Sequence, residues 1–325
     1  PRAPLIRDLD SLPWYPYELF DMHHYRMQRL PKNKPMDFCL PMMSARGCSF
    51  KCTFCYRMDP GYRKRDAKIL LDEVEMLHKD YGITYIAFED DLLMSSVVHT
   101  EEVCEEFIKR NLPVKWWCNG RLNYCSEELL QLMKNDPRMC PYLHVSMQSG
   151  STLILKRMKR RYDREFLMDR LSAAREHIGG LVLGADVMAG FPTESERDLQ
   201  DSLDVINSAE IIYPHVFCFS GRPGTPAARI PRQIQRVERR RRAAILRDAG
   251  QTLRREALNR MTGQSGRLIL ERSDPGEKPG AYHGRLANYM PVRLEDPKNA
   301  PPTEICVQIQ GVDGDVLVAR VSPPE

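Results

Sequence analysis

Short apolar runs alternate with segments of helical spacing through the middle of the chain. The apolar positions within 67–81 recur at the intervals of a helix, and Gly82 is placed to end it. The same pattern predicts strands at 37–43, 83–88, 114–119, 142–147, 181–189 and 214–220, with helices at 67–81, 99–110, 126–135, 163–177 and 195–208. Such strand–helix units predict an α/β fold, a parallel sheet wrapped by helices as a partial (β/α)6 barrel. Chemistry is then expected at the carboxyl ends of the strands.

The two ends of the chain follow other patterns. Residues 1–37 are rich in proline and aromatic side chains, which predicts an extended lead-in without regular structure. Residues 38–230 are predicted to form the α/β core described above, and residues 231–262 are predicted to form a basic linker helix. Residues 263–325 alternate in short strands, which predicts a small all-β barrel of the type that binds oligonucleotides. Its strands are expected at 267–272, 284–294, 304–310 and 315–321, with turns at Pro275-Gly276 and 311–314.

Length and composition restrict the class of protein. A chain of 325 residues can bury a core and form two domains. No run of about 18 apolar residues occurs, so no membrane-spanning helix is expected. The chain starts at Pro1 without an initiator Met or a signal peptide, which predicts a trimmed piece with an N-terminal domain missing. Ten cysteines fit a reducing compartment, and we therefore expect a cytoplasmic protein.

Charge is distributed unevenly along the sequence. The net charge is +4, yet residues 229–272 carry 13 Arg against 4 acidic residues, a local charge of +9. The rest of the chain has a net charge of −5. A local excess of this kind is typical of a protein that binds a polyanion. The run Arg239–Arg242 is also compatible with an ordinary solvated helix face.

Cys48, Cys52 and Cys55 form a C-x3-C-x2-C pattern within one loop. Three thiolates can hold three irons of a [4Fe–4S] cluster, and the fourth iron then stays open for another ligand. A structural zinc site would need four ligands, and no second C-x2-C pair exists in the sequence. A disulfide framework is unusual in a long chain without a secretory signal. The pattern therefore favours an iron–sulfur cluster.

This loop resembles the cluster loop of the radical S-adenosylmethionine (SAM) enzymes, in which SAM binds the open iron. The resemblance implies that the reduced cluster cleaves SAM to methionine and a 5′-deoxyadenosyl radical. It also implies SAM contacts at the strand ends, where charged and polar groups can meet the amine, carboxylate and ribose. The carboxylates of Glu89, Asp90 and Asp91 are expected at the SAM amine, and Arg121 is expected at its carboxylate. Ser146 and Gln148 are candidates for the ribose hydroxyls, and the strand with Asp186 and Gly190 is expected to let adenine approach. Tyr56 and Asn119 complete the cofactor-binding residues expected on this basis. No individual catalytic residue is assigned.

The second half of the chain, from about 140 to 321, resembles the tRNA methylthiotransferases. The motifs that carry this resemblance are Leu143–Ser151, Ile154–Tyr162, Gly184–Glu194 and His215–Ala227. The terminal barrel resembles the TRAM RNA-binding domain of that family, in its threonylcarbamoyladenosine branch. The resemblance implies a methylthio transfer to C2 of a modified adenosine in a tRNA anticodon loop. It further implies a flavodoxin or ferredoxin as electron donor and a second SAM as methyl source.

The barrel offers aromatic side chains that suit RNA loop bases. Tyr282, His283 and Tyr289 are candidates for stacking, with core packing expected for at least one of them.

The first half resembles cobalamin-type radical SAM enzymes instead. The segments that carry this resemblance are Asp8–Pro13, the Cys48 loop and Tyr81–Leu92. Methylthiotransferases also have an N-terminal domain whose three cysteines bind a second cluster. Cys39 is the only cysteine before Cys48, so this chain does not support a second cluster. Two alternatives therefore remain: a cobalamin-type methyltransferase or cyclase acting on a small molecule, and an RNA-binding protein with a structural cluster.

Overall fold

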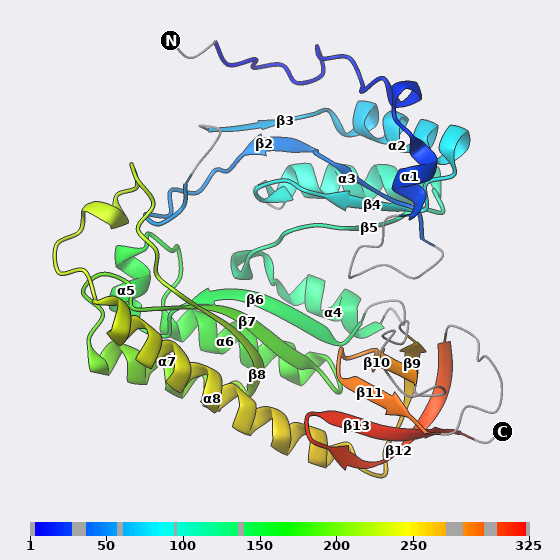
Figure 1. Ribbon diagram of the computed structural model, residues 1–325. Coiled ribbons are helices and arrows are strands. Elements are labelled where there is room, and N and C mark those ends of the chain that lie inside the picture. Colours follow the sequence, from blue (N-terminus) through cyan, green and yellow to red (C-terminus); the bar gives the residue numbers. More distant parts are fainter. Residues whose placement is uncertain are drawn as a thin grey trace. The chain divides into compact units, whose positions relative to one another are not determined.

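A computed structural model of the chain defines residues 4–27, 37–56, 61–93, 96–135, 140–270, 282–295 and 304–322. The chain folds as two compact units, Pro1–Tyr124 and Cys125–Glu325, hereafter unit 1 and unit 2. Figure 1 shows the elements of both units in sequence colours. Within the described residues, no helix has the length and apolar character needed to cross a membrane.

Unit 1 is built on a three-stranded parallel sheet in the order β1-β4-β5, with a separate antiparallel hairpin, β2-β3. Its described elements are η1 (Tyr17–Leu19), α1 (Met22–Met27), β1 (Cys39–Met42), β2 (Ala45–Gly47), β3 (Tyr62–Lys64), α2 (Ala67–Tyr81), β4 (Tyr85–Phe88), α3 (Val97–Arg110), β5 (Lys115–Trp117) and η3 (Leu122–Tyr124).

Helix α2 begins and ends where the sequence predicts. The Asp66 carboxylate accepts hydrogen bonds from the backbone N–H groups of Lys68 and Ile69, which caps the first turn. Gly82 follows the last turn in the left-handed conformation, with φ of 73°. The apolar stripe of α2 packs with α3 and the sheet into one core. The members of this core with no exposed surface include Leu70, Leu71, Val74, Leu77, Ile83, Ile86, Phe88 and Val103.

The lead-in contains short helices, so the prediction of no regular structure there was wrong. Prolines at positions 13 and 16 obscure the helical signal, yet η1 and α1 form on either side of Phe20. The Tyr17 hydroxyl donates a 2.7 Å hydrogen bond to the buried Glu73 carboxylate, which also pairs with Arg65 at 2.7 Å. This buried partner attaches the lead-in to α2.

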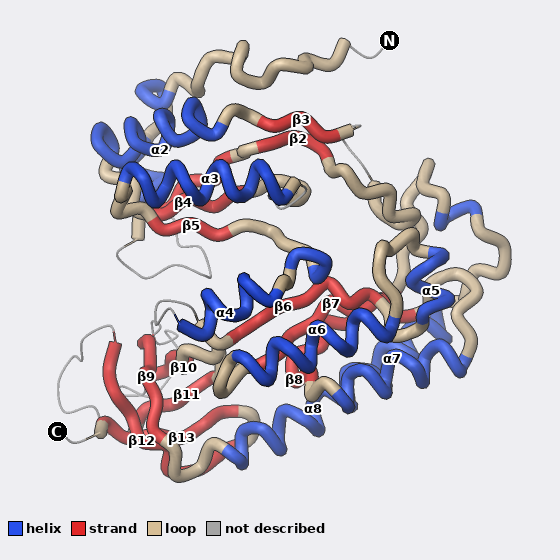
Figure 2. The backbone as a smooth tube through the Cα atoms, turned by 180° about the vertical axis from the view of Figure 1, so that it is seen from behind, coloured by secondary structure: helices blue, strands red, loops and turns tan. Residues whose placement is uncertain are grey.

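Unit 2 contains a second three-stranded parallel sheet, β6-β7-β8, followed by a closed barrel. The long helix α8 runs beside β8 and ends at the barrel (Figure 2). The elements before the barrel are α4 (Glu127–Asn135), β6 (Tyr142–Gln148), α5 (Thr152–Arg157), α6 (Arg164–His177), β7 (Val182–Ala189), α7 (Glu196–Ser208), β8 (Ile211–Cys218), η4 (Ala227–Arg229) and α8 (Arg236–Arg260).

The predicted strand–helix alternation is confirmed, with differences at short or proline-containing segments. The predicted α/β domain holds its six strands as two sheets of three, one in each unit. Strand β8 begins at Ile211, three residues before the predicted start, because Pro214 lies inside the strand instead of at its boundary. The six-residue helix α5, capped by the Ser151 hydroxyl, was not predicted. The β2-β3 hairpin was missed as well because each strand has only three residues.

The predicted barrel is confirmed as a closed five-stranded barrel in the order β10-β11-β13-β12-β9. Its strands are β9 (Ser265–Leu270), β10 (Tyr282–Leu286), β11 (Pro291–Leu294), β12 (Glu304–Asp313) and β13 (Val316–Val321). The alternating segment 284–294 contains parts of two strands, which gives five strands in all, because the chain turns back through Tyr289, whose φ is 72°. The turn expected at 311–314 was misplaced, since β12 continues through a bulge near Gly311 to Asp313. The turn predicted at Pro275-Gly276 lies outside the described residues.

The barrel shares its core with the rest of unit 2. Ala257 and Leu258 of α8 and Val182 and Ile212 of the sheet belong to the same buried cluster as the barrel strands. Tyr282, a predicted stacking residue, packs against this core.

A buried ion pair joins α8 to the segment after β7. Arg242 donates from Nη1 to the carboxylate of Glu194 at 3.0 Å and to its carbonyl oxygen at 2.8 Å. The two residues are 6% and 4% exposed, and Glu194 also accepts a hydrogen bond from the backbone N–H of Gly190. Burial raises the pKa of Glu194, although Arg242 acts in the opposite direction. Removing one partner would leave a buried charge without compensation.

We expect Arg242→Ala to lower the free energy of unfolding by about 3–5 kcal/mol, the usual cost of breaking a buried ion pair from one side. The matched control is Arg240→Ala, two positions earlier on the same helix, where the side chain is exposed. This control should change stability by about 0.5 kcal/mol or less. Denaturant unfolding followed by circular dichroism measures both, and equal effects would show that the ion pair does not hold α8.

Candidate functional site

The three predicted cluster cysteines lie on the loop that joins the antiparallel strands β2 and β3. Cys48 follows β2 directly and is partly buried, Cys52 is 7% exposed, and Cys55 is exposed. Phe50 and Leu92 form a small apolar cluster with Cys52. The loop therefore carries its thiols on a backbone fixed by the hairpin and partly screened from water.

Arg121 lies against the cysteine loop in unit 1. Its Nη1 donates to the Sγ of Cys52 at 3.9 Å, and its guanidinium carbon lies 3.7 Å from the ring centroid of Phe50. The side chain is 9% exposed. Arg121 was predicted to meet the carboxylate of SAM, and the structure places it on a cluster cysteine.

Asp90 is the buried member of the predicted carboxylate trio, with 3% of its surface exposed. Its carboxylate accepts hydrogen bonds from the backbone N–H of Ala45 at 2.5 Å and from the Ser44 hydroxyl at 3.0 Å. Burial raises the pKa of Asp90, although these hydrogen bonds act to lower it. The Asn119 side chain donates to the carbonyl oxygen of Asp90 at 3.3 Å. Asp90 therefore holds the start of β2, immediately before the cysteine loop.

The other predicted cofactor residues of unit 1 are exposed: Glu89, Asp91 and Tyr56. The backbone N–H of Glu89 donates to Met42 at 2.9 Å and extends the β1-β4 pairing. Glu89 also lines a cavity of about 560 Å³ whose wall is mainly apolar and includes Trp14. Glu89 and Asp91 therefore remain accessible to solutes, in contrast to Asp90.

In unit 2, Ser146 on β6 is held by two residues that follow α5. Arg160 donates from Nη2 to the carbonyl oxygen of Ser146 at 2.7 Å and to its hydroxyl at 2.8 Å. The Tyr162 hydroxyl also donates to the Ser146 carbonyl oxygen. Both partners come from the Ile154–Tyr162 motif, so one function of that motif is to fix the end of β6.

Gln148, at the end of β6, combines strain with an unsatisfied polar group. It is 6% exposed and has φ of 65°, a left-handed conformation that costs about 1–3 kcal/mol for a residue other than glycine. Its Oε1 is buried and has no hydrogen-bond partner among the described residues. A buried acceptor of this kind suits a ligand hydroxyl, the role that the sequence predicts for Gln148.

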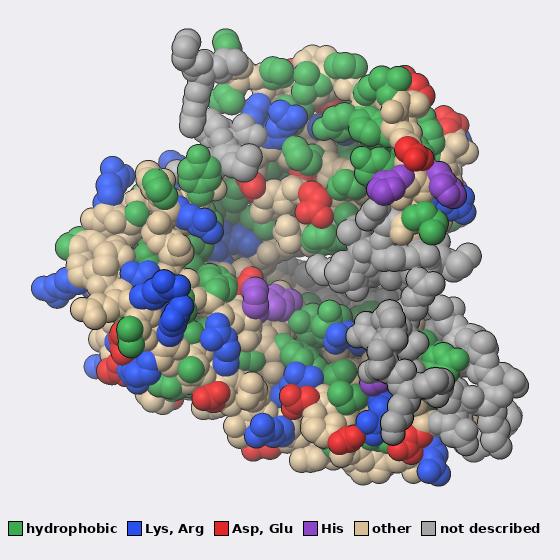
Figure 3. All heavy atoms as spheres, viewed as in Figure 1, with side chains coloured by type: hydrophobic (Ala, Val, Ile, Leu, Met, Phe, Trp, Pro, Cys, Tyr) green, Lys and Arg blue, Asp and Glu red, His purple; other side chains and the backbone are tan. Residues whose placement is uncertain are grey.

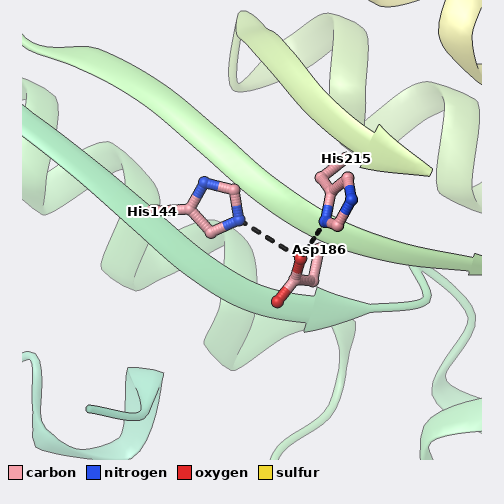
Figure 4. A group of neighbouring side chains, drawn as sticks. All are labelled: His144, Asp186 and His215. Atoms are coloured by element: carbon pink, nitrogen blue, oxygen red, sulfur yellow. Dashed lines mark hydrogen bonds and ion pairs between the residues drawn. The ribbon is translucent and has the colours of Figure 1, made fainter. Parts of the chain in front are cut away.

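Asp186 lies between two histidines that the sequence analysis did not select. His144 Nε2 lies 3.3 Å and His215 Nδ1 lies 2.8 Å from the same oxygen, Oδ1 of Asp186 (Figure 4). Burial acts to raise the pKa of Asp186, but the hydrogen bonds and charges of both imidazoles outweigh it and lower the pKa. The three residues come from the neighbouring strands β6, β7 and β8. The sequence did contain a signal for these histidines, because each of the three predicted apolar strands has a polar residue inside it.

Gly190, which was expected to let adenine approach, packs against helix α8. A Cβ built on it would lie 2.4 Å from Cγ of Arg239, and its φ is 74°. Close packing of α8 and a left-handed backbone are two reasons for glycine at this position.

The cysteine loop of unit 1 fits an iron–sulfur cluster. Three thiols on one loop, with a cation and apolar side chains around Cys52, match the donor set of a cluster with one open iron. Within unit 2, the buried Gln148 oxygen, which lacks a partner among the described residues, is matched to a hydroxyl donor such as those of ribose.

Three comparisons with known proteins extend this description. The chain is 32% identical over 263 residues to a threonylcarbamoyladenosine tRNA methylthiotransferase from Rickettsia prowazekii, covering 77% of this chain and 59% of that protein. It is 29% identical over 256 residues to a ribosomal protein uS12 methylthiotransferase from Clostridium botulinum, covering 75% of this chain and 56% of that protein. The chain thus spans less than two thirds of the length of these relatives.

Among solved structures, the chain is similar to a radical SAM methyltransferase from Kitasatospora setae with cobalamin and a [4Fe–4S] cluster bound. The TM-score is 0.49 and the identity 18%, covering 63% of this chain and 40% of that protein.

The family model described as the radical SAM superfamily matches residues 42–206, about half of the chain. This range includes the cysteine loop, Asp90, Arg121 and Gln148. Members of this superfamily use a [4Fe–4S] cluster and SAM. The chain belongs to the radical SAM superfamily.

Proposed function

We propose that this chain is the radical SAM and RNA-binding part of a methylthiotransferase that modifies C2 of N6-threonylcarbamoyladenosine in a tRNA anticodon loop. The observation that carries the proposal is the similarity to the Rickettsia prowazekii tRNA enzyme over 77% of this chain. The closed barrel supports an RNA substrate because small β-barrels of this kind commonly bind oligonucleotides. In this proposal 38–230 is the catalytic domain, 231–262 the linker helix and 263–325 the RNA-binding barrel.

The cysteine loop and the strand ends have separate tasks in this reaction. When bound, the reduced cluster supplies the electron that splits SAM into methionine and a 5′-deoxyadenosyl radical. Cys48, Cys52 and Cys55 hold the cluster, and Arg121 donates its hydrogen bond to the Cys52 sulfur. Hydrogen bonds to sulfur are one of the factors that set a cluster's reduction potential. Asp90 fixes the backbone at the start of β2, and Gln148 offers its buried oxygen to a SAM hydroxyl.

The cluster needs an external electron donor, and we propose a flavodoxin or ferredoxin. The cysteines must stay reduced to bind iron, so the reaction belongs in a reducing compartment such as the cytoplasm.

Helix α8 offers fewer arginines to RNA than its sequence suggests. Three members of the run Arg239–Arg242 are engaged within the protein. Arg239 donates to the Phe219 carbonyl oxygen at 2.6 Å, Arg241 pairs with two glutamates, and Arg242 is buried. Figure 3 shows Lys and Arg side chains interspersed with acidic ones over α7 and α8. The exposed arginines of α8 that pair with none of the described residues are Arg236, Arg240 and Arg255.

Anaerobic reconstitution tests the cluster assignment. The chain should take up about four irons, the content of one [4Fe–4S] cluster, and form 5′-deoxyadenosine from SAM when reduced with dithionite. The triple variant Cys48→Ala, Cys52→Ala, Cys55→Ala should lose both the iron and the product. Cys306→Ala, which removes an exposed thiol on β12, is the matched control and should keep both. Unchanged tRNA binding without any deoxyadenosine from the wild-type chain would instead favour an RNA-binding protein with a structural cluster.

Product analysis tests the substrate. The reconstituted chain is incubated with SAM, reductant and sodium sulfide as external sulfur source, in parallel with tRNA that carries threonylcarbamoyladenosine and with ribosomal protein uS12. We expect mass spectrometry to detect a methylthio group on the modified adenosine alone. Modification of uS12 alone would assign the chain to the other class of relative. Methylthio transfer would be contradicted if the chain cleaves SAM but modifies neither substrate, even after it is joined to the parts of the Rickettsia prowazekii relative that it does not cover.

Salt dependence tests the RNA contact of α8. Arg240→Ala should weaken tRNA binding and reduce the slope of log affinity against log salt by about one, the signature of one lost phosphate contact. Arg241→Ala is the matched control, because its guanidinium is already held by Glu196 at 2.5 Å and Glu238 at 2.8 Å. Filter binding at several salt concentrations measures the slopes. Identical slopes for Arg240→Ala and the wild-type chain would exclude this residue from the interface.

A further inference from the structure

His144, Asp186 and His215 converge on one point above the sheet of unit 2. Strands β6, β7 and β8 are parallel neighbours, and Asp186 is paired in register with His215. One oxygen of Asp186 lies 3.3 Å from Nε2 of His144 and 2.8 Å from Nδ1 of His215. Figure 4 shows both rings directed at that oxygen. Two imidazole nitrogens and a carboxylate oxygen on rigid strands form a set of metal ligands.

The spacing of these atoms suits a small divalent ion. Zinc binds histidine nitrogen at roughly 2.0–2.1 Å in tetrahedral geometry, so two of its ligand atoms lie about 3.3 Å apart. The two distances to the Asp186 oxygen are close to this value, and all three ligand atoms lie within 4.8 Å of one another. Only small side-chain shifts would separate them to the spacing that an ion requires.

His144 has a partner that orients its ring. The Tyr142 hydroxyl lies 3.1 Å from Nδ1, the nitrogen that faces away from Asp186. Metal-binding histidines almost always have such a partner on the second nitrogen. Gly184, which is paired with His144 on the adjacent strand, makes room for it. A Cβ at Gly184 would lie 2.5 Å from the Tyr142 oxygen and 2.7 Å from His144 Nδ1. Glycine at this position therefore preserves the Tyr142–His144 contact.

The cluster is accessible to an ion from solution. The side chains of His144, Asp186 and His215 are 38%, 34% and 73% exposed. Helix α8 packs on the other face of the sheet, because Gly250 faces Pro214, whose side chain points away from that of His215. Three protein ligands with access to solvent match a site that keeps one position open, in contrast to a closed structural site.

We propose that His144, Asp186 and His215 form a binding site for one divalent transition-metal ion, separate from the cysteine loop, with zinc as the representative ion. The ion takes the place of the hydrogen bonds between the imidazoles and Asp186. In the bound state His144 carries its proton on Nδ1, where it donates to the Tyr142 oxygen. The fourth position is open to water or to an oxygen ligand from a substrate.

Zinc binding to the full chain with its cluster reconstituted tests the site. The wild-type protein is titrated anaerobically with Zn²⁺ and compared with His144→Ala, His215→Ala and Asp186→Asn. We expect each variant to lose one equivalent of bound zinc. Tyr142→Phe keeps the aromatic ring but removes the outer hydrogen bond, and it should weaken binding about 10–100-fold. X-ray absorption at the zinc edge should show nitrogen and oxygen ligands without sulfur.

The matched control is His177→Ala, which removes a histidine of unit 2 that pairs with Glu127 and, within the part of the chain that the structure describes, belongs to no group of three metal ligands. It should bind as much zinc as the wild-type chain. Circular dichroism checks that every variant is folded, and the cluster absorbance checks that zinc has not displaced iron. Equal zinc stoichiometry and affinity in the wild-type chain and the three ligand variants, or sulfur ligands at the wild-type zinc, would overturn the proposal. The arrangement would then be a hydrogen-bonded triad without metal.

Discussion

A carboxylate buried at the end of β4 ties the start of β2 to the parallel sheet of unit 1. Asp90 accepts from the Ala45 N–H and the Ser44 hydroxyl, and the first cluster cysteine follows only three residues after Ala45. Burying a carboxylate is costly, so the geometry persists only because backbone and side-chain donors compensate it. Arg121 then contacts the loop from the end of β5, through Cys52 and Phe50. The position of the cysteines therefore depends on two neighbouring strands.

Local patterns predicted the regular elements well and the roles of individual side chains less well. Helix α2 was predicted to the residue because its cap, apolar stripe and terminal glycine are all encoded within 17 consecutive positions. Asp90 and Gly190 were selected as cofactor residues, and the structure adds contacts that the sequence did not predict: Asp90 anchors β2, and Gly190 packs against Arg239. Such roles depend on partners 45 and 49 residues away, which no local pattern contains. The histidines beside Asp186 were missed for the same reason.

Net charge along a segment and charge available to a partner are different quantities, as α8 illustrates. Arg240 and Arg242 are two residues apart, yet one is exposed and the other is buried against Glu194. The count of arginines predicted a basic helix. Ion pairs with Glu194 and Glu196, which are distant in sequence, and with Glu238 on the helix itself reduce the charge that is available to a partner. The positive charge that remains available to a partner is therefore concentrated at a few positions of the helix.

The common core of the barrel, α8 and the sheet has a mechanical consequence for unit 2. Because Leu258 and Ile212 are buried together with the barrel strands, the barrel cannot swing as a module on a hinge without exposing apolar surface. The stack of Tyr289 on Tyr142, with ring centroids 4.8 Å apart, adds a second attachment at the start of β6. A nucleic acid held by the barrel would thus be presented to the sheet at a constant distance. Under the proposed function, unit 2 would therefore reach only a nucleotide at a fixed distance along the strand from the barrel.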